Sequence, residues 1–141
     1  MNQALVDSMW TYLNAGLAMD VDALDRLYDP EFQNVRVDQA GQTVTLTKEQ
    51  FMARFRALRE QDRKIGESVD DVTFPATTDL GDQAAVMMRR VKGGAPVLYT
   101  FIWRMKDGQP TTILRELTFD RDISYLLGSG HLDEGGDTAR R

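Results

Sequence analysis

The spacing of hydrophobic residues changes once along this chain of 141 residues. Up to about residue 62, apolar side chains recur every three or four positions, and from residue 68 to 120 they alternate with polar ones. The first period is that of an amphipathic helix and the second that of a strand with one buried face. Helices early and strands late predict an α+β domain in which helices cover one face of a sheet.

The signals for individual elements agree with this order. Leu5, Met9 and Leu13 form a helical stripe, Asp20 is a helix N-cap, and TKEQ at 47–50 fits a capping box. Helices are predicted at 3–17, 21–28 and 47–62, and strands at 32–38, 44–46, 68–77, 83–92, 96–106 and 111–120. Glycine-bearing turns join the last four strands into an antiparallel meander. We predict a cone made of a curved, mainly antiparallel sheet with three helices on its concave face.

Length and composition favour one ordinary globular domain. Hydrophobic residues make up 42% and charged residues 28% of the chain. The last residues, GSGHLDEGGDTARR, are polar and rich in glycine. We therefore predict a single domain at 1–127 and a flexible tail at 128–141.

Several classes of function lack the residues they need. The chain has no cysteine, and its one histidine, His131, lies in the predicted tail, which argues against metal sites and Ser-His-Asp catalysis. The net charge is −5 without a basic stripe, which argues against nucleic-acid binding. The first residues lack a basic segment followed by a continuous apolar run, so we do not expect a signal peptide or a membrane span there. We expect a cytoplasmic protein with no cofactor, metal, nucleic-acid or membrane partner.

The order of elements, together with LYDPEF at 27–32 and FIWRMKDGQ at 101–109, resembles the nuclear-transport-factor-2-like superfamily, also called cystatin-like. The resemblance covers residues 1 to about 120. The superfamily includes ketosteroid isomerases, SnoaL-like polyketide cyclases and dioxygenase β subunits, so fold alone does not decide function. The resemblance implies an internal pocket. It also implies a homodimer formed through the outer sheet face, where Ile102, Ile113 and Leu117 would supply apolar contacts.

The segment YLNAGLAMDVDALDRLY at 12–28 is similar in length to the two-tyrosine segment of ketosteroid isomerases. The resemblance implies that Tyr12 lies in an oxyanion hole and that Tyr28 supports it. The aspartate base of that family falls on Arg36 and its acid partner on Phe101, so isomerisation by that machinery is not expected. The alternative is that both tyrosines are ordinary core residues.

Alternation along 32–38 leaves two interpretations of this strand. Asn34, Arg36 and Asp38 share one face, while Val35 and Val37 share the other. We favour the valines inside and the polar face in water. The resemblance places position 36 at the pocket mouth instead; Arg36 would then bind an anionic or carbonyl ligand, and Asp38 could act as a base.

The later strands supply further candidates. Tyr99, Phe101 and Trp103 alternate along one strand and are predicted to line the pocket with Phe55 of the third helix. Glu116 could act as a general acid or base if it is buried. The alternative, which we favour, is an ion pair with an arginine of a neighbouring strand, for which Arg89 is a candidate.

These observations predict a protein that binds a hydrophobic small molecule bearing an oxygen atom. Tyr12 is its expected polar contact. One alternative is an isomerase, cyclase or hydrolase that uses Tyr12 with Asp38 or Glu116. Another is a dimeric scaffold without a ligand.

Overall fold

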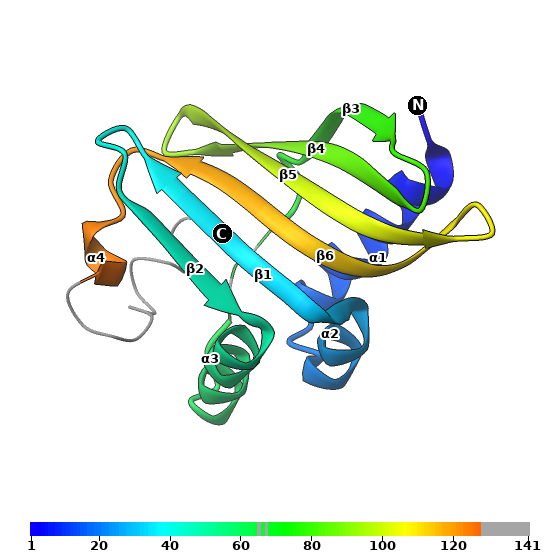
Figure 1. The fold of residues 1–141 in the computed structure, drawn as a ribbon. Helices are drawn as coiled ribbons and strands as arrows, with labels where there is room; N and C mark the ends of the chain where they lie inside the picture. Colours follow the sequence, from blue (N-terminus) through cyan, green and yellow to red (C-terminus); the bar gives the residue numbers. More distant parts are fainter. Residues whose placement is uncertain (65, 67, 128–141) are drawn as a thin grey trace.

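The computed structural model describes residues 1–64, 66 and 68–127 (Figure 1). The helices are α1 (Gln3–Leu17), α2 (Val21–Leu27), α3 (Lys48–Glu60) and the short α4 (Ser124–Leu127). The strands are β1 (Tyr28–Asp38), β2 (Thr43–Thr47), β3 (Thr73–Asp79), β4 (Gln83–Lys92), β5 (Ala95–Lys106) and β6 (Gln109–Asp120). The predicted tail at 128–141, with His131, lies outside the described residues.

One sheet of six strands organises the molecule. Its strand order is β2-β1-β6-β5-β4-β3. Among the described residues, β1 and β6 pair in parallel, and the other four pairs of strands are antiparallel. The sheet is curved and unclosed, and α1, α2 and α3 lie on one side of it (Figure 1). The predicted α+β class and mainly antiparallel sheet are therefore confirmed.

The helix starts follow the predicted capping chemistry. The Asp20 side chain accepts a hydrogen bond from the amide of Ala23 at 3.1 Å. At the start of α3, the Gln50 amide donates to the Thr47 hydroxyl, and the Thr47 amide donates to the Gln50 side chain. These bonds satisfy amide groups that a helix leaves without partners at its first turn.

Some boundaries differ from the prediction. β1 begins at Tyr28 rather than at residue 32, because Tyr28 already pairs with Ile113 of β6. β3 begins at Thr73 rather than at residue 68; Val72 donates its amide to the carbonyl of Val69, which closes a turn there. The helix α4 was not predicted.

The predicted position of Ile113 is also wrong. Ile113 was expected on the outer face, but it is fully buried in the core. The reason is an irregularity in the β5–β6 pairing: Ile102 pairs with Arg115, whereas the next residue, Trp103, pairs with Ile113. This shift breaks the strict alternation of faces along β6.

Candidate functional site

The two tyrosines of the 12–28 segment meet inside the cone. Their hydroxyl oxygens are 2.6 Å apart, and either hydroxyl can be the donor. Tyr12 is 6% exposed and Tyr28 is 1% exposed. α1 carries Tyr12 on its buried side, and the turn into α2 brings the first residue of β1 back to it. Tyr12 also packs edge-on against Phe101, with ring centroids 5.6 Å apart.

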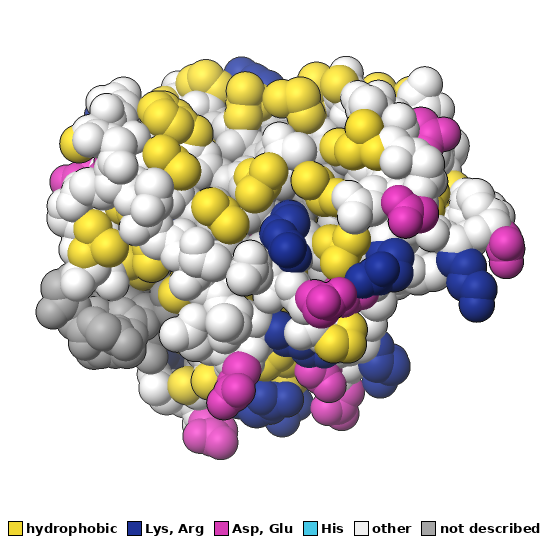
Figure 2. All heavy atoms as spheres, in the orientation of Figure 1, with side chains coloured by type: hydrophobic (Ala, Val, Ile, Leu, Met, Phe, Trp, Pro, Cys, Tyr) yellow, Lys and Arg dark blue, Asp and Glu magenta, His cyan; other side chains and the backbone are white. Residues whose placement is uncertain are grey.

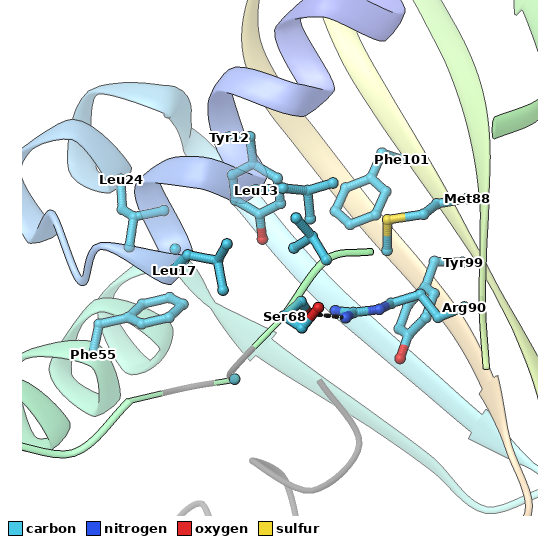
Figure 3. Close-up of a pocket in the computed structure, with 13 residues that line it drawn as sticks. Tyr12, Leu13, Leu17, Leu24, Phe55, Ser68, Met88, Arg90, Tyr99 and Phe101 are labelled. Carbon is cyan, nitrogen blue, oxygen red and sulfur yellow. Dashed lines mark hydrogen bonds between the residues drawn. The ribbon is translucent and has the colours of Figure 1, made fainter. Parts of the chain in front are cut away.

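A cavity of about 50 Å³ lies beside this pair, between α1, α3 and the concave face of β4 and β5 (Figure 3). Most of its lining is apolar or aromatic. The lining residues are Tyr12, Leu13, Gly16, Leu17, Leu24, Phe55, Gly66, Ser68, Val69, Met88, Arg90, Tyr99 and Phe101. Four predicted ligand contacts, Tyr12, Phe55, Tyr99 and Phe101, are therefore among them.

Three predicted ligand contacts do not line this cavity. Tyr28 lies behind Tyr12 and packs against Phe32, with ring centroids 4.3 Å apart. Trp103 is 1% exposed, and its indole N–H points to the sulfur of Met9 at 3.3 Å. Both are core residues around the cavity. Arg36 lines a different cavity, which is described below.

Arg90 is a cavity residue that was not among our candidates. Its guanidinium donates to the carbonyl of Ser68 at 2.7 Å (Figure 3). It also contacts the carboxylate of Asp71 at 3.3 Å. Burial acts to raise the pKa of Asp71, but the amide of Val91 and the Arg90 guanidinium outweigh it and lower that pKa. Arg90 therefore ties the segment before β3 to the edge of the cavity. The sequence did contain a signal for this position, because Arg90 lies two residues after Met88 on the same strand and therefore on the same face of the sheet.

The polar residues of β1 face inward, so the interpretation that we favoured is wrong. Asn34, Arg36 and Asp38 are 0%, 2% and 2% exposed, whereas Val35 and Val37 are only half-buried. Local hydrogen bonds offset the cost of this burial. Arg36 donates to the Asn34 side chain at 2.9 Å and to the hydroxyl of Tyr125, in α4, at 3.0 Å.

Asp38 serves the hairpin between β1 and β2. Its carboxylate accepts hydrogen bonds from the amides of Ala40, Gln42 and Ile123 and from the Gln42 side chain. The amide of Ile123, followed by those from the hairpin, holds the pKa of Asp38 below its ordinary value. A carboxylate stabilised in its charged form accepts protons weakly, so this environment suits a structural role better than a general base.

Glu116 lies at the centre of the concave face and is fully buried. Its neighbours across the strands are Asn34 on β1 and Phe101 on β5. Arg89, the candidate that we named for an ion pair with Glu116, is not its partner, because Arg89 is exposed on the opposite face of β4, where it pairs with Leu98.

Within residues 1–64, 66 and 68–127, no group of three or more His, Cys, Asp or Glu side chains is arranged to hold a metal ion. In the same part of the chain, no helix has the length and apolar character needed to cross a membrane.

Comparison with known proteins identifies the architecture. No protein-family model and no curated protein matches the sequence. Among solved structures, an NTF-2 like protein of unknown function from Shewanella oneidensis MR-1 is 17% identical, with a TM-score of 0.58 over 84% of this chain and 98% of that chain. Another from Silicibacter pomeroyi DSS-3, also of unknown function, is 17% identical, with a TM-score of 0.60 over 82% and 91%. The chain has the nuclear-transport-factor-2-like fold.

This fold occurs in proteins of different kinds. A third similar structure is the β subunit of a putative aromatic-ring-hydroxylating dioxygenase from Novosphingobium aromaticivorans DSM 12444, which is 11% identical, with a TM-score of 0.58 over 86% of this chain and 90% of that chain. At such identities the nuclear-transport-factor-2-like fold is what the chains share, so function must be argued from the site.

Proposed function

We propose that this protein binds a hydrophobic small molecule that carries an oxygen acceptor, and that Tyr12 contacts this oxygen. The observation that carries the proposal is the pair of tyrosine hydroxyls, 2.6 Å apart, at the wall of an apolar cavity. When Tyr28 donates to Tyr12, the Tyr12 proton can point to a ligand. Hydrogen bonds in a chain polarise one another, and a low-dielectric site strengthens them.

The shape of the cavity limits the ligand. At about 50 Å³ it accommodates a narrow group rather than a whole large molecule. Its aromatic lining, with Phe55, Tyr99 and Phe101, favours a flat or slender apolar group.

A thermal-shift screen tests the proposal. The compounds are hydrophobic ketones, polyketide-like aromatics, terpenoid epoxides and steroids. A ligand that binds only the folded protein raises its melting temperature. We expect the shift to shrink in Tyr12→Phe and to persist in Thr111→Val, which removes an exposed hydroxyl away from the cavity. Equal shifts in both variants would contradict the assigned role of Tyr12.

A second candidate is an enzyme that uses Glu116 with Tyr12. The observation that favours it is the complete burial of Glu116 beside Asn34 and Phe101 on the concave face. Asp38 is less suited, because its four hydrogen bonds stabilise the charged form. Turnover of a compound from the screen should fall by about 10²-fold or more in Glu116→Gln. Unchanged turnover would eliminate Glu116 as the acid or base.

The homodimer is likewise a proposal. Hydrophobic side chains are spread over the outer sheet face in the upper part of Figure 2. Leu98, Leu117 and Phe119 on this face are 48%, 37% and 59% exposed. Burial of such a surface drives association. We expect a dimer in sedimentation at micromolar concentration, and a monomer in Phe119→Arg but not in Leu80→Arg, which alters an exposed leucine in a turn. A wild-type monomer would refute this proposal.

A further inference from the structure

The sheet divides at one end, between β5 and β6. Their last pair is Tyr99 with Thr118, although β5 starts at Ala95 and β6 ends at Asp120. Beyond that pair, residues 95–98 stay with β4, and residues 119 and 120 stay with β1. β5 and β6 diverge accordingly toward the β4–β5 turn (Figure 1).

A cleft of about 650 Å³ lies at this division. It is lined from both sides of the division and from the β4–β5 turn. The lining residues are Arg36, Gln39, Lys92, Gly93, Ala95, Pro96, Val97, Leu98, Tyr99, Thr118, Phe119, Asp120 and Arg121. The cleft is much larger than the aromatic cavity and combines polar with apolar side chains.

The charge of this cleft is opposite to that of the whole chain. Arg36, Lys92 and Arg121 contribute three positive charges and Asp120 one negative charge, which leaves +2, whereas the chain carries −5. Arg36 is 2% exposed, so part of this charge lies in the protein interior. A cleft with low-dielectric walls and a net positive charge concentrates anions, so this cleft favours an anionic ligand.

The hydroxyl of Thr118 is a second observation at the same place. Thr118 is 7% exposed, and no group among the described residues hydrogen-bonds its hydroxyl. Its cross-strand neighbours are Arg36 on β1 and Tyr99 on β5. A change of χ1 exchanges the positions of its hydroxyl and methyl groups, so this hydroxyl can turn to a ligand in the cleft. A buried polar group without a partner is costly, and a ligand oxygen would relieve that cost.

Tyr99 connects the cleft with the aromatic cavity. It lines both of them and is 3% exposed. We propose that the two cavities bind one amphiphilic anion. Its apolar body, with the oxygen that Tyr12 contacts, lies against Tyr99 and Phe101, and its carboxylate-like head lies in the cleft with Arg36, Lys92 and Arg121. This inference rests on the proposed function, because it names the class of ligand for the aromatic cavity.

Matched probes with the same apolar body test the inference. 6-(4-Acetylphenyl)hexanoate and 6-(4-acetylphenyl)hexanol share a ketone for Tyr12 and differ only in the head group, and their affinities are measured by calorimetry at low and high salt. We expect the acid to bind about tenfold more tightly than the alcohol at low salt, since several partly exposed charge pairs each contribute modestly. High salt should reduce this ratio, because counter-ions screen the exposed cations.

Variants locate the anion. In the double variant Lys92→Gln/Arg121→Gln, the affinities for the acid and the alcohol should differ by no more than about twofold. The double variant Arg89→Gln/Lys106→Gln removes the same charge from exposed positions outside the cleft and should keep the wild-type ratio. Thr118→Val should weaken binding of the acid without loss of folding.

The outcomes separate the two proposals. Equal binding of acid and alcohol overturns the anion inference and leaves the proposed function standing. A preference for the acid that survives in Lys92→Gln/Arg121→Gln also overturns it, because the head group would then lie elsewhere. If neither probe binds and the screen of hydrophobic compounds yields no shift, the proposed function itself is refuted.

Discussion

The Tyr12–Tyr28 contact can be measured as a coupling energy with Tyr12→Phe, Tyr28→Phe and the double variant. Each single change removes one oxygen from a buried pair whose oxygens are 2.6 Å apart and leaves both rings in place. Loss of one partner of a buried hydrogen bond costs about 1–2 kcal/mol, because the other group loses a partner in an apolar environment. The double variant removes both polar groups, so its cost should not exceed either single cost by more than a few tenths of a kcal/mol.

Urea unfolding, followed by the fluorescence of Trp10 and Trp103, gives the free energy of unfolding of all four proteins. With a slope of about 2 kcal/mol per molar urea, the middle of the typical range, each single variant should shift the midpoint by roughly 0.5–1 M. The coupling energy should be about 1 kcal/mol or more. If the two single effects add to within about 0.3 kcal/mol, the hydroxyls do not interact in the native state, and our account of the site is refuted.

Three further predictions concern residues around the site. Hydrogen bonds from Arg104 and Thr112 outweigh the effect of burial and lower the pKa of Asp29 to about 2. Because this pKa lies below its value in the unfolded chain, ionised Asp29 stabilises the folded protein above about pH 4, and this stabilisation is lost as the pH falls toward 2. After allowance for the exposure of Arg104, the contribution of Asp29 to the free energy of unfolding is about 1 kcal/mol. Wild type should therefore lose more unfolding free energy than Asp29→Asn over this range, and parallel pH curves would contradict the pairing. Thr118→Val should stabilise the ligand-free protein by about 1 kcal/mol in urea unfolding, whereas a loss of similar size would mean that the hydroxyl has a partner. Gly108→Ala should cost about 1 kcal/mol, because the backbone at Gly108 has φ +75°, and an unchanged melting temperature would refute this.

Local chemistry made the helices and turns predictable. The capping groups at Asp20 and Thr47 fall where short-range hydrogen bonding dictates, since they depend on neighbours within a few residues. The turn at Asp107 and Gly108 likewise has positive φ at both residues, as its Asp-Gly sequence predicts. Four residues of the cavity lining were also predictable, because strand alternation and the helical stripe place aromatic side chains on buried faces.

The alternation of polar and apolar residues alone could not predict which face of β1 is buried. Period two divides the residues of β1 into two faces, but it does not say which face the helices cover. The choice depends on partners distant in sequence: Tyr125 of α4 accepts from Arg36, and Ile123 donates to Asp38. These contacts join residues that are more than eighty positions apart. A rule based on hydropathy therefore placed the valines of β1 inside.

The inward orientation of the polar residues of β1 and β6 determines which side chains lie on both faces of the sheet. Because Asn34, Arg36 and Glu116 occupy buried positions, the interior contains polar groups that a plain hydrophobic core would not require. The same alternation turns Leu117 and Phe119 outward, where they remain partly exposed. A chain selected for stability alone would reverse both faces, since burial of apolar groups stabilises and burial of charged groups costs. Polar groups kept inside at such a cost are typical of ligand sites, and exposed apolar groups on the opposite face are typical of an interface between subunits. The two proposals, a polar contact inside the cone and a dimer outside it, therefore explain one arrangement of the sheet.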